Sequence, residues 1–369
     1  MIAEEDVKKT FAELVAIDSP SLGEREMADH IKKLFGELGI ELIEDNSSQI
    51  TGSTAGNLYG YVRGNGKAPI LLSAHMDTVM PAFGKKAIFH SDGSITSDGT
   101  TVLGADDLSG ITAIYEAVRY LKLHHIAHRD VELLFTTGEE LYCKGAKAFD
   151  YTKIKAKSAL VLDLSGRIGN AAYAAPTILS FEVSVQGKAA HAGFCPEDGI
   201  HAIKAVCEAI ASLPQGHIDE GTTANIGMIS GGDGINIVPE KCIVKGEIRS
   251  LSHEKAMEVA EKYRAMFLKS AACYGAQAEW IQQIDIKAYE IDPASKIIDE
   301  YKRALSQLDI VPNLSKTFGG SDNNVFAQNG IEGIVIATSM NNVHSCKEWA
   351  NVSEIVQITK ILICMTTYK

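Results

Sequence analysis

The stretch P-I-L-L-S-A-H-M-D-T, residues 69–78, decides the fold class. Its first half is almost wholly apolar, which is typical of a strand buried on both faces of a sheet. Similar apolar runs recur later, separated by stretches of helical periodicity such as Leu108–Leu123; these runs are Val131–Thr137, Leu160–Leu164 and Gly333–Ala337. Buried strands that alternate with helices predict an α/β layer architecture.

The middle of the chain follows a different pattern. Thr177–Gln186 alternates apolar and polar residues like a half-buried strand, and further helical and strand-like stretches follow it. Their order, β-α-β-β-α-β, is that of a ferredoxin-like α+β unit. We therefore predict a discontinuous α/β domain of residues 1–176 and 291–369, with a smaller domain of residues 177–290 inserted into it.

The N-terminal segment, residues 3–38, predicts two helices with a break near Asp18-Ser19-Pro20. Ser21 and Glu24 have the spacing of a capping box, in which each side chain satisfies a backbone N–H of the first helical turn. This spacing predicts that the second helix begins at Ser21.

Composition excludes several classes of protein. The chain has 369 residues, and Lys+Arg total 35 against Asp+Glu 47, a net charge of −12. A nucleic-acid binder normally carries the opposite balance. We find no apolar run of the roughly 20 residues that a membrane helix needs, and the charged start lacks the pattern of a secretory signal. Seven scattered cysteines without a C-x-x-C pair suit reduced thiols, so we expect a cytoplasmic protein.

Acidic residues and histidines gather where the predicted strands end. They are His75 and Asp77 after the first strand, Glu139 and Glu140 after the second, Asp163 at the end of the third, Asp106 before a helix and His344 after the last strand. Ligands of open α/β sheets bind at the carboxyl ends of strands. Imidazole and carboxylate suit Zn²⁺, and two such ions can clamp both the attacking and the developing oxygen while a separate carboxylate moves the proton.

Together these motifs resemble the dinuclear zinc exopeptidase family that includes peptidase T, aminoacylase and the glutamate carboxypeptidases. The resemblance covers essentially the whole chain. It rests on H-M-D-T at 75–78, S-D-G-T-T-V-L-G-A-D-D at 97–107, T-T-G-E-E at 136–140, V-L-D at 161–163, A-H-A-G at 190–193, N-I-V-P at 236–239 and His344. The second of these motifs and K-G-A-K-A-F-D at 144–150 are most similar to the peptidase T branch.

The resemblance implies a mixed-sheet zinc-exopeptidase catalytic domain and makes the insert a lid and dimerisation domain. It also implies two Zn²⁺ per subunit, for which Co²⁺ or Mn²⁺ can substitute. His75 and Asp163 would bind one ion, Glu140 and His344 the other, and Asp106 would bridge the two.

The resemblance gives further residues a role. Glu139 would be the general base that takes a proton from a zinc-activated water, and Asp77 would orient the His75 imidazole. Members of the family have a cis peptide bond after the bridging Asp106. Departures from the family pattern fall at Leu108-Ser109 and at Leu141-Tyr142-Cys143, where a small Ile-Gly type stretch is common.

Four residues match the substrate contacts of the family. His191 would stabilise the tetrahedral oxyanion in a partner subunit's site. Asn236 and Arg249 would recognise the terminal carboxylate of the substrate, for which a guanidinium fork is well suited. Ser321 belongs to a loop that would contact the substrate backbone.

We therefore expect a metal-dependent peptidase that releases the N-terminal residue of tripeptides and forms a homodimer through the lid domain. Its partner molecules would be short peptides, with neither nucleic acid nor membrane. Two alternatives stay open: an N-acyl amino acid deacylase or carboxypeptidase of the same family, and a catalytically inactive peptide-binding module. The second conflicts with the full set of ligands and the base, none of which is missing.

Overall fold

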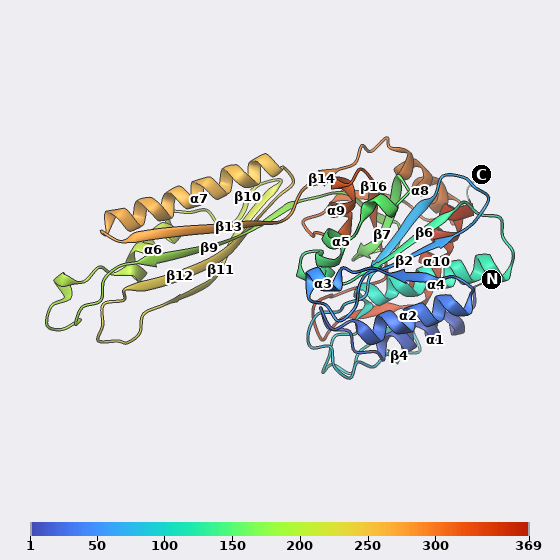
Figure 1. Ribbon diagram of the computed structural model, residues 1–369, viewed down its shortest axis with the longest axis horizontal. Helices are drawn as coiled ribbons and strands as arrows, with labels where there is room; N and C mark the ends of the chain where they lie inside the picture. The colour runs from blue at the N-terminus through green and yellow to red at the C-terminus, as the bar shows by residue number, and fades with distance from the viewer. Residues whose placement is uncertain (1, 368–369) are drawn as a thin grey trace. The chain divides into compact units, whose positions relative to one another are not determined.

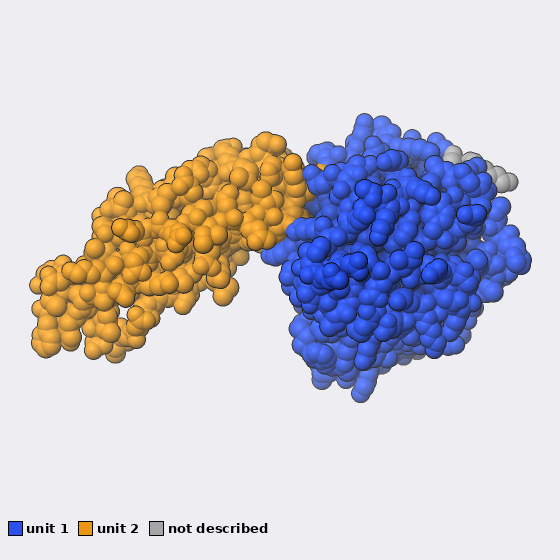
Figure 2. All heavy atoms as spheres, in the orientation of Figure 1, with its two compact units in different colours: residues 1–174, 290–317, 321–369 blue, residues 175–289, 318–320 orange. Residues whose placement is uncertain are grey.

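The computed structural model describes residues 2–367. The chain divides into two compact units, coloured separately in Figure 2: residues 1–174, 290–317 and 321–369 form unit 1, and residues 175–289 and 318–320 form unit 2. The sequence-based boundaries at 177 and 290 lie close to these limits. Phe318–Gly320, which the sequence analysis leaves in the larger domain, groups with unit 2. Within the described residues, every helix is too short or too polar to cross a membrane.

Unit 1 is built on a nine-stranded mixed sheet with the order β1-β2-β6-β3-β7-β16-β8-β14, and β15 pairs with β8 (Figure 1). The strands are β1 Leu42–Glu44, β2 Leu58–Val62, β3 Ile70–His75, β6 Val131–Thr136, β7 Ser158–Leu164, β8 Asn170–Ala175, β14 Tyr289–Glu290, β15 Asn313–Lys316 and β16 Glu332–Ala337. The central strands β6, β3, β7 and β16 run parallel to one another. Their carboxyl ends therefore meet at one edge of the sheet.

The central strands are mostly apolar because helices cover the sheet. β3 and β6 are buried at every position. α4, Ala105–Leu123, packs on β3 and β7 and is itself covered by α1, Glu4–Val15, and α10, Val352–Thr367. A helix between two layers is buried on all sides, and α4 is buried from Ala105 to Val118. The remaining helices of unit 1 are α2 Arg25–Glu37, α3 Ser48–Thr51, α5 Lys144–Ala148, α8 Lys296–Ser306 and α9 Asp322–Gln328.

Unit 2 is an antiparallel five-stranded sheet with the order β10-β11-β12-β9-β13 and two helices that pack on it. The elements are β9 Thr177–Gln186, α6 Ala202–Ala211, β10 Gly216–Asp219, β11 Thr222–Gly231, β12 Lys241–Ser250, α7 His253–Cys273 and β13 Gln277–Ile286. The alternation of β9 directs Leu179, Phe181 and Val183 into the core beneath the helices. The predicted mixed α/β class with an inserted α+β domain is confirmed, and β10 is an addition to the expected ferredoxin-like order.

The predicted capping box at Ser21 and Glu24 is wrong. α2 begins at Arg25, and the N-terminal cap position is Glu24, whose side chain makes no capping hydrogen bond. Ser21 Oγ instead donates to Asp77 Oδ2 at 2.7 Å. The fully buried Glu24 accepts from the backbone N–H of Leu22 and of Gly138 at 2.8 and 2.9 Å. Glu24 therefore contacts the loop after β6 and Ser21 contacts the segment after β3, and neither caps its own helix.

Candidate metal centre and active site

The predicted ligands come from segments that end at one edge of the unit 1 sheet. His75 is the last residue of β3, and Asp163 lies near the end of β7. Glu140 belongs to a 3-10 helix, Glu139–Leu141, that directly follows β6. Asp106 opens α4 with a non-helical backbone, and the peptide bond that joins it to Asp107 is cis, as expected. His344 lies in the loop between β16 and β17, Trp349–Asn351.

These side chains form two groups that share one residue. His75, Asp106 and Asp163 offer ligand atoms within 4.8 Å of one another, and so do Asp106, Glu140 and His344. Asp106 Oδ1 lies 3.0 Å from His75 Nε2, while its Oδ2 lies 3.4 Å from His344 Nε2. The two oxygens of one carboxylate thus face two different histidines. This is the arrangement that a carboxylate needs to bridge two ions.

The donor chemistry of both groups fits divalent metal ions. Each group combines imidazole with carboxylate, which suits Zn²⁺ in a site that keeps an open position. Glu140 Oε2 lies 3.0 Å from His344 Nε2, whereas the buried Glu140 Oε1 makes no hydrogen bond. A buried oxygen without a donor is costly, and a metal ligand bond would satisfy it.

Electrostatics also indicates a need for positive charge. Burial raises the pKa of Glu140 and of Asp163 above their usual range, and the neighbouring Asp106 carboxylate adds to both shifts. Asp106 and Glu140 in turn raise the pKa of His344 to about 10 through hydrogen bonds. Crowded carboxylates resist ionisation unless cations compensate them. Histidine protonation supplies part of this compensation, and bound metal ions would supply it while leaving the imidazoles neutral.

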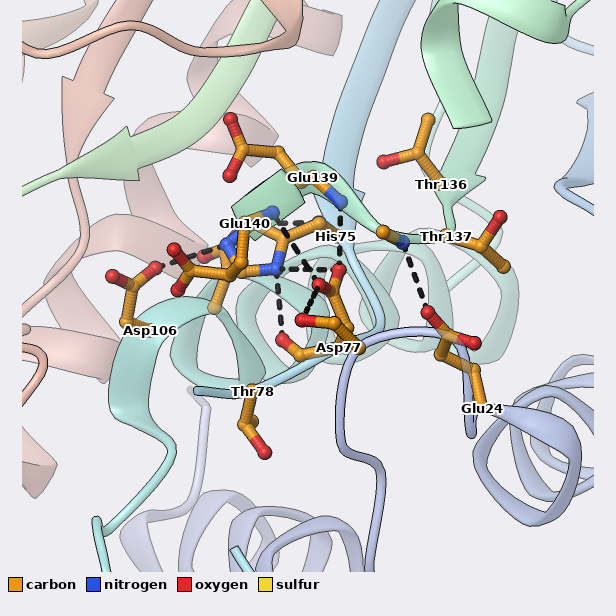
Figure 3. Close-up of polar contacts among 12 residues, drawn as sticks. Glu24, His75, Asp77, Thr78, Asp106, Thr136, Thr137, Glu139 and Glu140 are labelled. Atoms are coloured by element: carbon orange, nitrogen blue, oxygen red, sulfur yellow. Dashed lines mark hydrogen bonds and ion pairs between the residues drawn. The ribbon is translucent and has the colours of Figure 1, made fainter. Parts of the chain in front are cut away.

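Asp77 connects the histidine of β3 to both glutamates. Figure 3 shows its carboxylate beneath the Glu139–Leu141 turn, where it accepts the backbone N–H of Glu139 at 2.9 Å and of Glu140 at 3.3 Å. His75 Nδ1 lies 2.9 Å from the Asp77 carbonyl oxygen and 3.4 Å from Asp77 Oδ1. The closer partner of the imidazole is therefore the backbone carbonyl. The carboxylate acts mainly on the turn that carries the glutamates.

Sequence reasoning missed Glu348, which supports Asp106. Its side chain is 2% exposed and accepts the backbone N–H of Gly104 at 2.7 Å and of Asp106 at 2.9 Å. Burial raises its pKa to about 7. Its position four residues after His344 is the only signal that the sequence offers.

The four predicted substrate residues fall in both units. Ser321, in unit 1, is buried as the N-cap of α9, and its Oγ accepts the N–H of Asn323. The other three belong to unit 2. Arg249 donates to Glu247 and, at 3.0 Å, to the Phe318 carbonyl. The Asn236 carbonyl accepts the N–H of Ala192, next to His191.

His191 is exposed and its tautomer is set by its own turn. Its Nδ1 accepts the backbone N–H of Gly193 at 3.1 Å and of Phe194 at 3.2 Å. Because Nδ1 is an acceptor, the ring hydrogen of the neutral imidazole lies on Nε2. The side chain therefore presents one N–H donor to the outside of unit 2.

Comparisons with known proteins agree with this geometry. Residues 57–195 match the family described as Peptidase family M28, and residues 173–272 match the M20 family described as Peptidase dimerisation domain. The Bacillus subtilis protein YqjE is 37% identical over 366 residues, which cover 99% of this chain and 98% of that protein.

Two solved structures are similar over their whole length. Aminopeptidase PepT from Bacillus cereus is 36% identical with a TM-score of 0.93, covering 99% of this chain and 98% of that one. A tripeptidase from Staphylococcus aureus is 30% identical with a TM-score of 0.97, covering 100% and 98%.

The fold and site define a metal-dependent hydrolase that acts on peptide bonds. Within that class, the chain belongs to the M20 family of dinuclear metallopeptidases, in its peptidase T-like branch. The predicted family and enzyme class are confirmed.

Proposed function

We propose that the protein is a tripeptide aminopeptidase that works with two Zn²⁺ per subunit. The observation that carries this proposal is Asp106, whose two carboxylate oxygens face His75 and His344. The names of the two similar structures, an aminopeptidase and a tripeptidase, support the choice of substrate. They also disfavour the deacylase and carboxypeptidase alternatives.

In this proposal His75 and Asp163 hold one ion, Glu140 and His344 hold the other, and Asp106 lies between them. Bound there, two divalent ions would lower the pKa of a water molecule and polarise the scissile carbonyl. Co²⁺ or Mn²⁺ can replace Zn²⁺ at such ligands.

Glu139 is the proposed proton carrier. Its backbone is fixed by the hydrogen bond to Asp77, and its side chain is 8% exposed. Burial and the nearby Asp163 raise the pKa of Glu139 well above its usual range. A carboxylate with a raised pKa is a better proton acceptor and can return the proton to the leaving amine.

Unit 2 carries three of the four proposed substrate contacts and the proposed dimer interface. The His191 Nε2–H would donate to the oxyanion, and Asn236 and Arg249 would bind the C-terminal carboxylate of the tripeptide. Ser321 of unit 1 would lie against the substrate backbone. The match to a peptidase dimerisation domain supports a homodimer, and the seven free cysteines support the cytoplasm as its location.

A substrate panel on the zinc-loaded enzyme tests the proposal. One tripeptide is offered with free ends, with an N-acetyl group and with a C-terminal amide, and products are identified by mass. We expect only peptides with a free amine to be cleaved, with release of the N-terminal residue. Preference for the acetylated form would instead establish the deacylase or carboxypeptidase alternative.

The variant Glu139→Gln tests the proton carrier separately. Because Gln has the same shape and cannot accept a proton, turnover should fall by about 10²-fold to 10⁴-fold. The two catalytic ions should still bind, since Glu139 is not a proposed ligand of either of them. Turnover at the wild-type rate would remove Glu139 from this role.

A further inference from the structure

A third group of metal-binding side chains lies beside the two already described. Glu139, Cys143 and Asp322 offer ligand atoms within 4.8 Å of one another. The three side chains are 8%, 1% and 2% exposed, respectively. They come from different segments: the turn after β6, the residue before α5, and the first residue of α9.

The turn that follows Glu140 brings the thiol to Glu139. Tyr142 and Cys143 both have left-handed backbones, with φ of 63° and 57°, and the Cys143 N–H bonds back to the Glu139 carbonyl at 2.7 Å. Cys143 Sγ donates to Glu139 Oε1 at 3.4 Å. Zinc ligand distances of about 2.3 Å to sulfur and about 2.1 Å to oxygen place two tetrahedral ligands about 3.6 Å apart. The observed separation therefore suits a shared metal ion.

Asp322 gives an independent indication of a binding site, because one of its buried oxygens has no hydrogen-bond donor. Its Oδ2 accepts a hydrogen bond from Thr136 Oγ1 at 2.5 Å, while the buried Oδ1 makes no hydrogen bond. Burial raises the pKa of Asp322 to about 6, and burial also raises the pKa of Cys143 well above its usual range. A buried acidic group with an unsatisfied oxygen and a thiol as neighbour offers the mixed sulfur and oxygen donors that zinc and cadmium accept.

We propose that Glu139, Cys143 and Asp322 form a third, inhibitory site for a thiophilic divalent cation such as Zn²⁺, Cd²⁺ or Co²⁺. Binding releases the Cys143 thiol proton to solvent and forms a metal–thiolate bond, with carboxylate oxygens from the other two residues. A cation held there occupies the carboxylate of Glu139, which can then no longer accept a proton. The inhibition rests on the proposed function of Glu139, whereas the binding of the cation does not.

Cobalt titration tests the binding directly, because the two main groups contain no cysteine. Co²⁺ is added to metal-free enzyme, and the near-ultraviolet thiolate-to-cobalt charge-transfer band is followed. We expect two equivalents to bind without the band and a third to produce it in the wild type. The band should be absent in Cys143→Ser and weakened in Asp322→Asn. A matched control, Cys273→Ser in an exposed part of α7, should keep it.

An unchanged band in Cys143→Ser, or a wild-type titration that saturates without any band, would overturn the proposal. Circular dichroism verifies that each variant is folded. Because these readouts need no turnover, they stand even if the tripeptide assay fails.

The activity arm measures tripeptide cleavage against free Zn²⁺. Wild-type activity should rise as the first two ions bind and then fall at higher concentration. Relative to its own maximum, Cys143→Ser should need at least a tenfold higher Zn²⁺ concentration for half-inhibition, and Cys273→Ser should match the wild type. Equal inhibition of Cys143→Ser and wild type would refute the inhibitory role.

Discussion

The variant Glu348→Gln should weaken both proposed metal positions at once, because Glu348 holds the backbone of Asp106, the proposed shared ligand. Its two carboxylate oxygens each accept one backbone N–H, from Gly104 and from Asp106. A Gln side chain has one acceptor oxygen, so its NH₂ group must face the other N–H. Losing a hydrogen bond to a charged group and leaving a buried N–H unpaired together cost about 2–4 kcal/mol in the free energy of unfolding.

The same loss loosens Asp106, so we expect about a 10-fold to 100-fold loss of affinity for both ions, as is typical when an outer-shell partner is removed. Denaturant unfolding of metal-free protein measures the stability, and competition with a chromophoric chelator measures the affinity. Both are done at pH 8.5. Burial raises the pKa of Glu348 from 4.5 to about 7, so the folded state binds more protons than the unfolded state between these values, and the stability of the wild type should rise relative to Glu348→Gln as the pH falls through this range.

Glu354→Gln is the matched control. Glu354 accepts one hydrogen bond, from Ser339 Oγ at 2.7 Å, in the neighbouring first turn of α10. The control should bind both ions like the wild type. If Glu348→Gln is as stable as Glu354→Gln and binds both ions equally well, Glu348 does not support Asp106 and the reasoning is refuted.

Three further predictions concern the metals, the substrate and pH. Chelation of the metals should abolish activity and lower the melting temperature. When the free metal ion is at about 1,000 times its Kd, each occupied site stabilises the folded protein by about 4 kcal/mol, and chelation removes this stabilisation. Equal melting temperatures of metal-free and loaded protein would contradict this. Arg249→Lys should raise KM for a free tripeptide about tenfold with little change in kcat, because the bidentate fork is lost; an equal rise for the C-amidated peptide would exclude a carboxylate contact. Burial lowers the pKa of Lys85 from 10.5 to about 8, so the folded state binds fewer protons than the unfolded state between these pH values. The stability of the wild type relative to Lys85→Met should therefore rise by about 3 kcal/mol across this pH range. A stability difference that does not vary with pH would refute this prediction.

The central sheet could be predicted from sequence because burial on both faces leaves a simple signal. Ile70–His75 and Val131–Thr136 are mostly apolar with polar residues at and after their ends, and both features follow from parallel strands under helices. The three-stranded sheet of β17, β5 and β4, Ile88–Phe89, could not be predicted in this way. β5, Ser94–Thr96, is three residues long and pairs with Trp349–Asn351 from the other end of the chain. Such a pairing has no local pattern.

The residue types of the ligands could be predicted for a related reason, but the hydrogen bonds that hold these residues in place could not. Histidines and acids at strand ends are visible in sequence, whereas the partner of a polar side chain depends on tertiary contacts. Ser21 and Glu24 show the difference. Their spacing matches a capping box, yet their side chains reach Asp77 and Gly138, which lie far along the chain. Local spacing predicts a local hydrogen-bond partner. That prediction fails when a buried carboxylate, here that of Asp77, competes for the same hydroxyl.

The acidic residues in this site are of two kinds, which differ in the groups that their carboxylates contact. Asp77 and Glu348 each accept two backbone N–H groups from the turns that carry the proposed ligands, whereas Glu24 accepts one from Gly138 in such a turn and one from Leu22. Such contacts stabilise a buried negative charge without a counter-ion and hold the turns in place. Asp106 and Glu140 instead direct oxygens at His344 Nε2, and Glu140 Oε1 has no donor.

Carboxylates satisfied by amides have little left to offer a metal, whereas those that face imidazole nitrogens keep their lone pairs available. The same criterion sets Asp322 apart, since its Oδ1 makes no hydrogen bond while Cys143 and Glu139 stand beside it. We therefore expect excess cadmium or cobalt to bind at Asp322 before it binds at the acidic residues whose carboxylates accept backbone N–H groups. Anomalous scattering from crystals soaked in excess cadmium would show this. A third cadmium peak beside Glu24 or Glu348, with none beside Cys143, would refute the distinction and the third site together.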